Sequence, residues 1–159
     1  MKKAIIFFVV LIGFSTLYAQ SSTYPIYIIL SAKTSGEDGI IKVSTNNKLF
    51  KTPHIIYFID YRSKGIHLFF EHNNFNTSEL SKIRKVKAND QKETLHKSTS
   101  FLKTIAPIDL DVLLPKWTKE QALAFRDSLQ GKKIYIIDRN ETKNKQIVLV
   151  EVTCHKSAW

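Results

Sequence analysis

Two pairs of apolar segments constrain the fold of this chain more than any other feature of its sequence. Residues 56–61 (IYFIDY) and 66–71 (IHLFFE) flank a short basic turn, and residues 134–138 (IYIID) and 146–152 (QIVLVEV) flank a longer polar loop. Apolar, β-branched runs separated by a loop that contains Gly or Asn predict β-hairpins. We therefore expect two antiparallel hairpins, which we do not treat as a repeat because their loops differ in length.

Other segments predict strands by composition. Residues 26–32 and 40–45 are rich in β-branched and aromatic side chains, which favour the extended conformation. Residues 48–52 are compatible with a short return strand. Residues 109–114 are expected to be extended, and residues 95–105 fit a helix or a strand equally well.

The clearest helix is predicted over residues 119–130. Thr118 and Gln121 have the spacing of a capping box, in which each side chain satisfies a backbone N–H at the start of the helix. Gly131 supplies the stop signal. A second helix is possible over residues 79–87. These elements together predict an α+β fold with a mainly antiparallel sheet of about five to seven strands built from hairpins.

The N-terminus has the three regions of a secretory signal. Lys2 and Lys3 precede an apolar run over residues 4–14, and a small residue, Ala19, follows a more polar stretch. This pattern predicts cleavage after Ala19 and leaves residues 20–159 as a single globular domain in the periplasm or outside the cell. An uncleaved anchor is the alternative, but the run is shorter than the roughly 20 residues that span a membrane.

Cys154 is the only cysteine, so an internal disulfide is excluded and stability depends on packing. A free thiol and an intermolecular disulfide remain alternatives for Cys154. Its position after a valine-rich run favours a third interpretation, a thiol buried as an apolar side chain. Without Lys2 and Lys3, 22 Lys and Arg face 14 Asp and Glu, a formal charge of +8. Such a charge favours anionic partners, although it also serves plain solubility.

The first hairpin contains the most reactive combination of side chains. Antiparallel pairing across its turn places Asp60 opposite His67, with Glu71 on the same face. A histidine between carboxylates is a candidate general base, and a metal site would need His72 as well. His67 and His72 point to opposite faces of a strand, however, because their separation is odd. A solvent-facing polar cluster is therefore favoured over a catalytic or metal site.

Two other charged segments have plain structural interpretations. Asp109 and Asp111 have the D-x-D spacing that can hold a divalent cation, yet they fit the polar side of an extended segment better. A basic cluster lies between residues 82 and 103, with Phe101 as its only aromatic residue. Because stacking aromatics are typical of nucleic-acid binding, nucleic acid is an unlikely partner and a solvated basic face is favoured.

No nucleophile elbow, glycine-rich phosphate loop, C-x-x-C or H-E-x-x-H motif is present in the sequence, and no cofactor or metal is expected. The sequence therefore predicts an exported, non-catalytic binding protein for an anionic polymer or a protein partner. Its expected surface contacts are Tyr57, Tyr61, Lys82, Arg84, Lys85 and Lys87. The alternatives are an envelope immunity or inhibitor protein against a toxin or hydrolase, and a small hydrolase that uses His67 with Asp60 or Glu71.

Overall fold

The computed structural model describes residues 24–33, 39–46, 50, 52–73 and 92–155. Three predictions lie outside these residues: the signal over residues 1–19, the helix over residues 79–87, and the cations Lys82, Arg84, Lys85 and Lys87. The predicted return strand over residues 48–52 is described only at Phe50 and Thr52.

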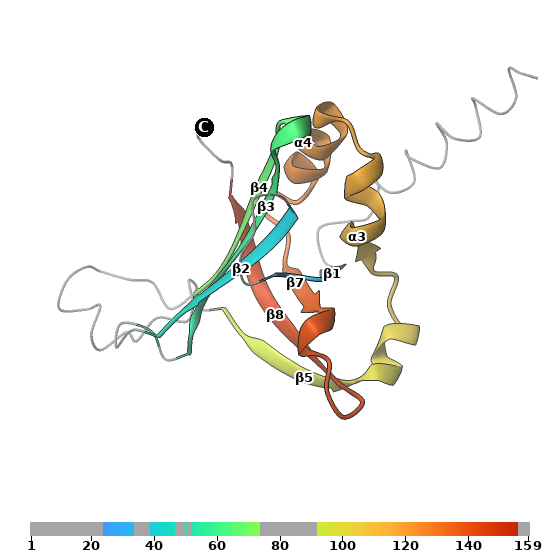
Figure 1. Cartoon of the computed structure of the whole chain (residues 1–159). Helices are drawn as coiled ribbons and strands as arrows, with labels where there is room; N and C mark the ends of the chain where they lie inside the picture. Colours follow the sequence, from blue (N-terminus) through green and yellow to red (C-terminus); the bar gives the residue numbers. More distant parts are fainter. Residues whose placement is uncertain (1–23, 34–38, 47–49, 51, 74–91, 156–159) are drawn as a thin grey trace, which may run out of the picture.

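The described part of the chain is mostly β-sheet (Figure 1). The described residues form eight strands, more than the five to seven expected. Seven of them follow the order β2-β3-β4-β8-β7-β1-β6, and β5 pairs with β8 beside this path. The strands are β1 (Ile26–Leu30), β2 (Gly39–Thr45), β3 (His54–Tyr61), β4 (Ile66–His72), β5 (Thr94–Ser98), β6 (Ile108–Asp109), β7 (Ile134–Asp138) and β8 (Gln146–His155).

Both predicted hairpins are present. β3 pairs with β4 and β7 pairs with β8, each antiparallel, and Asp60 lies opposite His67 as predicted. The expectation of a mainly antiparallel sheet is wrong, because β1 runs parallel to both of its neighbours, β7 and β6. The sheet is therefore mixed. Parallel neighbours need long crossover connections, so no local pattern in β1 indicates its partners.

Strand β8 makes the sheet curl. Its first half pairs with β5 and its middle, residues 149–152, pairs with β7, whereas its last three residues pair with β4. One long strand therefore belongs to two differently oriented parts of the sheet, and the whole forms a curled half-barrel (Figure 1). The Lys33 amide donates to Ile40 (2.8 Å) and the Lys42 amide donates to Lys33 (2.7 Å), which joins the chain after β1 to β2.

Two short helices, α3 (Leu110–Leu113) and α4 (Lys119–Ser128), lie on one side of the curled sheet (Figure 1). The predicted capping box is present: the Thr118 amide donates to the Gln121 side chain (2.9 Å), and the Gln121 amide donates to Thr118 Oγ1 (3.3 Å). Gly131 follows the helix with a φ of 70°, a conformation that glycine adopts without strain.

The prediction that residues 109–114 are extended is wrong beyond Asp109. Asp109 ends β6, and its side chain accepts a hydrogen bond from the Val112 amide (3.4 Å), which caps α3. Pro115 lies in the first turn of the 3₁₀ segment Leu114–Lys116, where a missing N–H costs nothing. The ambiguous residues 95–105 form both kinds of structure, since β5 ends at Ser98 and a 3₁₀ turn (Thr99–Lys103) follows.

The core occupies the inside of the curl. Ile28, Leu30 and Phe70 are fully buried there, and α4 adds Ala122 and Leu129. A second apolar cluster on the other side of β7 and β1 is covered by β5 and the 3₁₀ turn; it comprises Ile29, Tyr135, Ile137, Ile147 and Leu149. Within the described residues, no helix has the length and hydrophobicity needed to cross a membrane.

Candidate ligand groove

A largely apolar groove of about 860 Å³ runs along α4. Its walls come from residues 24–27 at the start of β1, from residues 104–108 before and within β6, and from α4 itself. Leu113 and Trp117, which lie between β6 and α4, and Leu129 and Lys132, which follow α4, complete the lining. Binding sites for small molecules are typically cavities of about 300–1,000 Å³ lined by apolar and aromatic side chains, so this groove has the size and composition of a ligand site.

Helix α4 presents separate faces to the core and to the groove. Ala122 is buried in the core, whereas Gln121, Ala124, Phe125 and Ser128 line the groove. These four residues recur at the spacing of i, i+3, i+4 and i+7, which places them on one side of a helix. The periodicity of α4 therefore creates a groove wall as well as a core contact.

Aromatic and aliphatic side chains form the inner surface of the groove. The rings of Trp117 and Phe125 lie 4.9 Å apart between centroids and are tilted by 48°. Both pack, partly buried, against the core cluster. Tyr27 on the opposite wall stacks on Tyr135 with a centroid distance of 5.7 Å, so rings anchored in the core shape both walls.

Lys132 is the only charged side chain among the described residues that line the groove. No ion pair joins it to another described residue. Its neighbour Lys133 differs, because Lys133 Nζ lies 2.6 Å from Glu93 and 3.5 Å from Glu151. Those contacts raise the pKa of Lys133, the hydrogen bond to Glu93 contributing most. Among the described residues, Lys132 is therefore a lining cation without an acidic partner.

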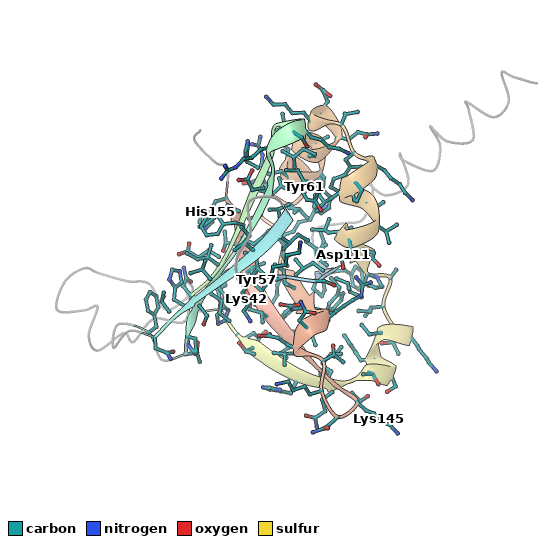
Figure 2. The ribbon with its side chains drawn as sticks, viewed as in Figure 1. Lys42, Tyr57, Tyr61, Asp111, Lys145 and His155 are labelled. Atoms are coloured by element: carbon teal, nitrogen blue, oxygen red, sulfur yellow. The ribbon has the colours of Figure 1, made fainter. Side chains whose placement is uncertain are left out.

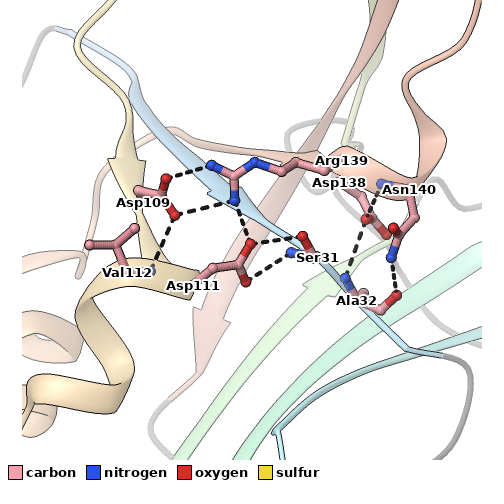
Figure 3. Close-up of polar contacts among 8 residues, drawn as sticks. All are labelled: Ser31, Ala32, Asp109, Asp111, Val112, Asp138, Arg139 and Asn140. Atoms are coloured by element: carbon pink, nitrogen blue, oxygen red, sulfur yellow. Dashed lines mark hydrogen bonds and ion pairs between the residues drawn. The ribbon is translucent and has the colours of Figure 1, made fainter.

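A polar network holds α3, which contributes Leu113 to the groove lining (Figure 3). The Arg139 guanidinium pairs with Asp109 (2.5 Å) and with Asp111. The Asp111 carboxylate in turn accepts hydrogen bonds from the Ser31 amide (3.1 Å) and the Ser31 hydroxyl (2.8 Å). Arg139 also holds the pKa of Asp109 below its usual range. Because Asp109 caps α3, this network fixes α3 to the ends of β1 and β7.

A second set of polar contacts lies beside this network. Buried Asp138 accepts hydrogen bonds from the Ala32 amide (3.3 Å) and the Asn140 amide (3.0 Å), and the Asn140 side chain donates to the Ala32 carbonyl (2.6 Å) (Figure 3). Burial raises the pKa of Asp138. These bonds join the C-terminal ends of β1 and β7.

The predicted polar cluster of the first hairpin is divided in two by the structure. His67 Nδ1 lies 2.9 Å from Asp60, and the His67 side chain is 48% exposed. Glu71 pairs instead with His54 (2.7 Å) and His155 (2.9 Å). Figure 2 shows His155 on the side of the sheet away from α3 and α4. None of these side chains lines the groove.

His72 points to the opposite face from His67, as its position in the strand predicts. It is buried, and its Nδ1 lies 2.8 Å from the Glu151 carbonyl oxygen. Burial lowers the pKa of His72, whereas the nearby Glu151 acts in the opposite direction. No group of three or more candidate metal ligands is found within the ranges that the structure describes.

The expectation that Tyr57 is a surface contact is wrong. Its side chain is fully buried, as is that of Ile59. The two lie on the same face of β3, the inner one, because alternate residues of a strand face the same side. Lys42 Nζ lies 5.7 Å from the centre of the Tyr57 ring (Figure 2). Tyr61 shares this face and packs, partly buried, against the core. Cys154 is buried, as predicted.

Sequence reasoning did not find the groove, Lys132 or the role of Arg139. The groove brings together residues between 24 and 132 that share no local motif, and Lys132 resembles the other lysines of a basic chain. Comparison of the chain with protein-family models, curated proteins and solved structures finds no match. The geometry of the groove is therefore the best guide to function.

Proposed function

We propose that this chain is an exported, non-catalytic binding protein that holds a small apolar ligand in the groove along α4. The observation that carries the proposal is the groove itself, about 860 Å³ in volume and lined by Trp117, Phe125 and Tyr27. Buried apolar surface contributes about 25 cal/mol per Å², so a ligand that fills such a groove gains affinity without any covalent chemistry.

Two further features support binding rather than hydrolysis. The candidate acid–base residues Asp60 and His67 lie outside the groove lining. The lining rings of Trp117 and Phe125 are held against the core, and a preorganised site loses little entropy when its ligand binds.

Fluorescence of Trp117 tests the proposal. The chain has two tryptophans, so Trp159→Phe leaves Trp117 as the only indole reporter. We expect a saturable change in Trp117 emission when decanol is added. Ala124→Phe places a ring on the groove face of α4 and should weaken binding about tenfold, or about 1.4 kcal/mol.

Asp127→Phe is the matched control for this variant. Asp127 is an exposed α4 residue outside the groove lining, so a ring at this position should leave decanol affinity unchanged. Equal losses in the two variants would contradict the proposed location, and unsaturable emission changes would contradict the proposed function.

Export is a separate part of the proposal, and it rests on residues 1–19. The mass of the chain recovered from outside the cytoplasm should match a mature protein that begins at Gln20. A recovered mass that includes residues 1–19 would contradict signal cleavage.

A further inference from the structure

We infer that the ligand of the groove is a single-chain amphiphile whose carboxylate head group pairs with Lys132 and whose alkyl tail lies along α4 toward Trp117. This inference rests on the proposed function and names the class of ligand. It follows from the charge of the lining, from the position of that charge, and from the number of cations that the groove offers.

The charge of the lining favours an anion. Lys132 has no acidic partner among the described residues, and no described lining residue carries a negative charge. Complementary charge gives specificity to binding. A neutral hydrocarbon would leave the Lys132 ammonium without a partner at the edge of the site, whereas an anionic head group would supply one.

The position of Lys132 gives the ligand a direction. Gln121 lies near the start of α4 and Ser128 at its end, a separation of roughly 10 Å at 1.5 Å per residue. Lys132 follows beyond the left-handed Gly131, and Trp117 precedes the helix. The only charged lining residue is therefore at one end of an apolar surface, and the Trp117–Phe125 ring pair lies toward the other end. This polarity is that of a head group followed by a tail.

The number of cations favours a carboxylate over a phosphate. Phosphate dianions are commonly bound by helix N-termini and by the paired N–H groups of arginine, whereas a lysine contributes one point charge. Lys132 is instead a single ammonium, and it lies beyond the C-terminal end of α4, where the helix dipole is negative. The described arginines Arg139 and Arg126 lie outside the lining and are already paired with carboxylates. One lysine at this position matches one monoanionic carboxylate.

Calorimetric titration of the purified full chain with decanoate, decanol and decyl phosphate tests the inference. We expect decanoate to bind about tenfold more tightly than decanol, and this difference should shrink at high salt because charge pairing is screened. Lys132→Met, which keeps most of the side-chain length, should weaken decanoate binding about tenfold and leave decanol binding unchanged. Lys133→Met is the matched control, since Lys133 is paired with Glu93 and lies outside the lining.

The possible failures are distinguishable. Equal affinity for decanoate and decanol, or full decanoate affinity in Lys132→Met, would overturn the head-group assignment and leave the proposed function standing. Tighter binding of decyl phosphate than of decanoate would overturn the choice of carboxylate. Absence of binding for all three compounds would overturn the proposed function itself. Urea midpoints of the two lysine variants that match the parent chain would show that both remain folded.

Discussion

Replacement of Tyr57 by Phe, which removes only the hydroxyl group, should stabilise this protein. The Tyr57 hydroxyl is buried and has no hydrogen-bond partner among the residues that the structure describes. Burial raises the pKa of Tyr57 well above its usual range, and the nearby carboxylates of Glu141 and Asp138 add to that effect. A buried polar group without a partner costs about 1–3 kcal/mol. Removal of the oxygen leaves a small void, so we expect a net gain of about 1 kcal/mol.

Urea unfolding followed by circular dichroism measures this gain. The midpoint should rise with an unchanged slope, and the melting temperature should rise by about 2–4 °C. Tyr135→Phe is the matched control, because the Tyr135 hydroxyl donates to Glu93 (2.5 Å). That variant should lose about 1 kcal/mol. A loss of more than about 1 kcal/mol in Tyr57→Phe would refute the reasoning, since the hydroxyl would then make a hydrogen bond in solution.

Three further predictions follow from buried and paired groups. Burial lowers the pKa of His72, so the folded state favours the neutral imidazole ring. The contribution of this neutral ring to folding stability is present above the unfolded pKa of about 6.5 and is lost as the pH falls below that value. Urea midpoints should therefore drop between about pH 7.5 and about pH 5.5, and His72→Gln should flatten this drop; equal slopes would contradict it. Arg139→Gln should lower stability by about 1 kcal/mol, since the pairs are partly exposed, and should speed hydrogen exchange at Val112; unchanged exchange would contradict the bracing role. Burial raises the pKa of Cys154 to about 11, so a thiol reagent should label it only on unfolding; rapid labelling of the native chain would count against burial.

The predictable parts of this fold are those with local signals. The hairpin of β3 and β4 has its turn, its apolar runs and its register within one short segment, and the pairing of Asp60 with His67 followed from these alone. Helix α4 is equally local, because Thr118 and Gln121 form its capping box and Gly131 ends it.

The unpredictable parts depend on contacts between distant segments. The parallel partners of β1, β6 and β7, lie about 80 to 110 residues further along the chain. Parallel strands are not joined by a tight turn, so no local turn signal predicts their pairing. Asp109 and Asp111 have the spacing of an extended segment, yet Arg139 and Ser31 hold them at the start of α3. The burial of Tyr57 could not be predicted from nearby residues, because it depends on the curl that the distant strand β8 gives to the sheet.

The groove also depends on contacts between distant segments, so no local sequence pattern predicted it. Its walls come from β1, from the segment before β6 and from α4, and the one cation of the described lining is an ordinary lysine in sequence. Only the folded arrangement shows that Lys132 has no acidic partner among the described residues, whereas Lys133 is neutralised by Glu93.

Nuclear magnetic resonance titration of the purified chain with decanoate tests the central claim most directly. If the groove is the binding site, amide shifts should change in a saturable way for Ala124, Phe125 and Lys132 and in the indole of Trp117, while His67 on the outer face stays unaffected. Shift changes confined to the outer face of β3 and β4, or no saturable change in the groove residues, would contradict the account.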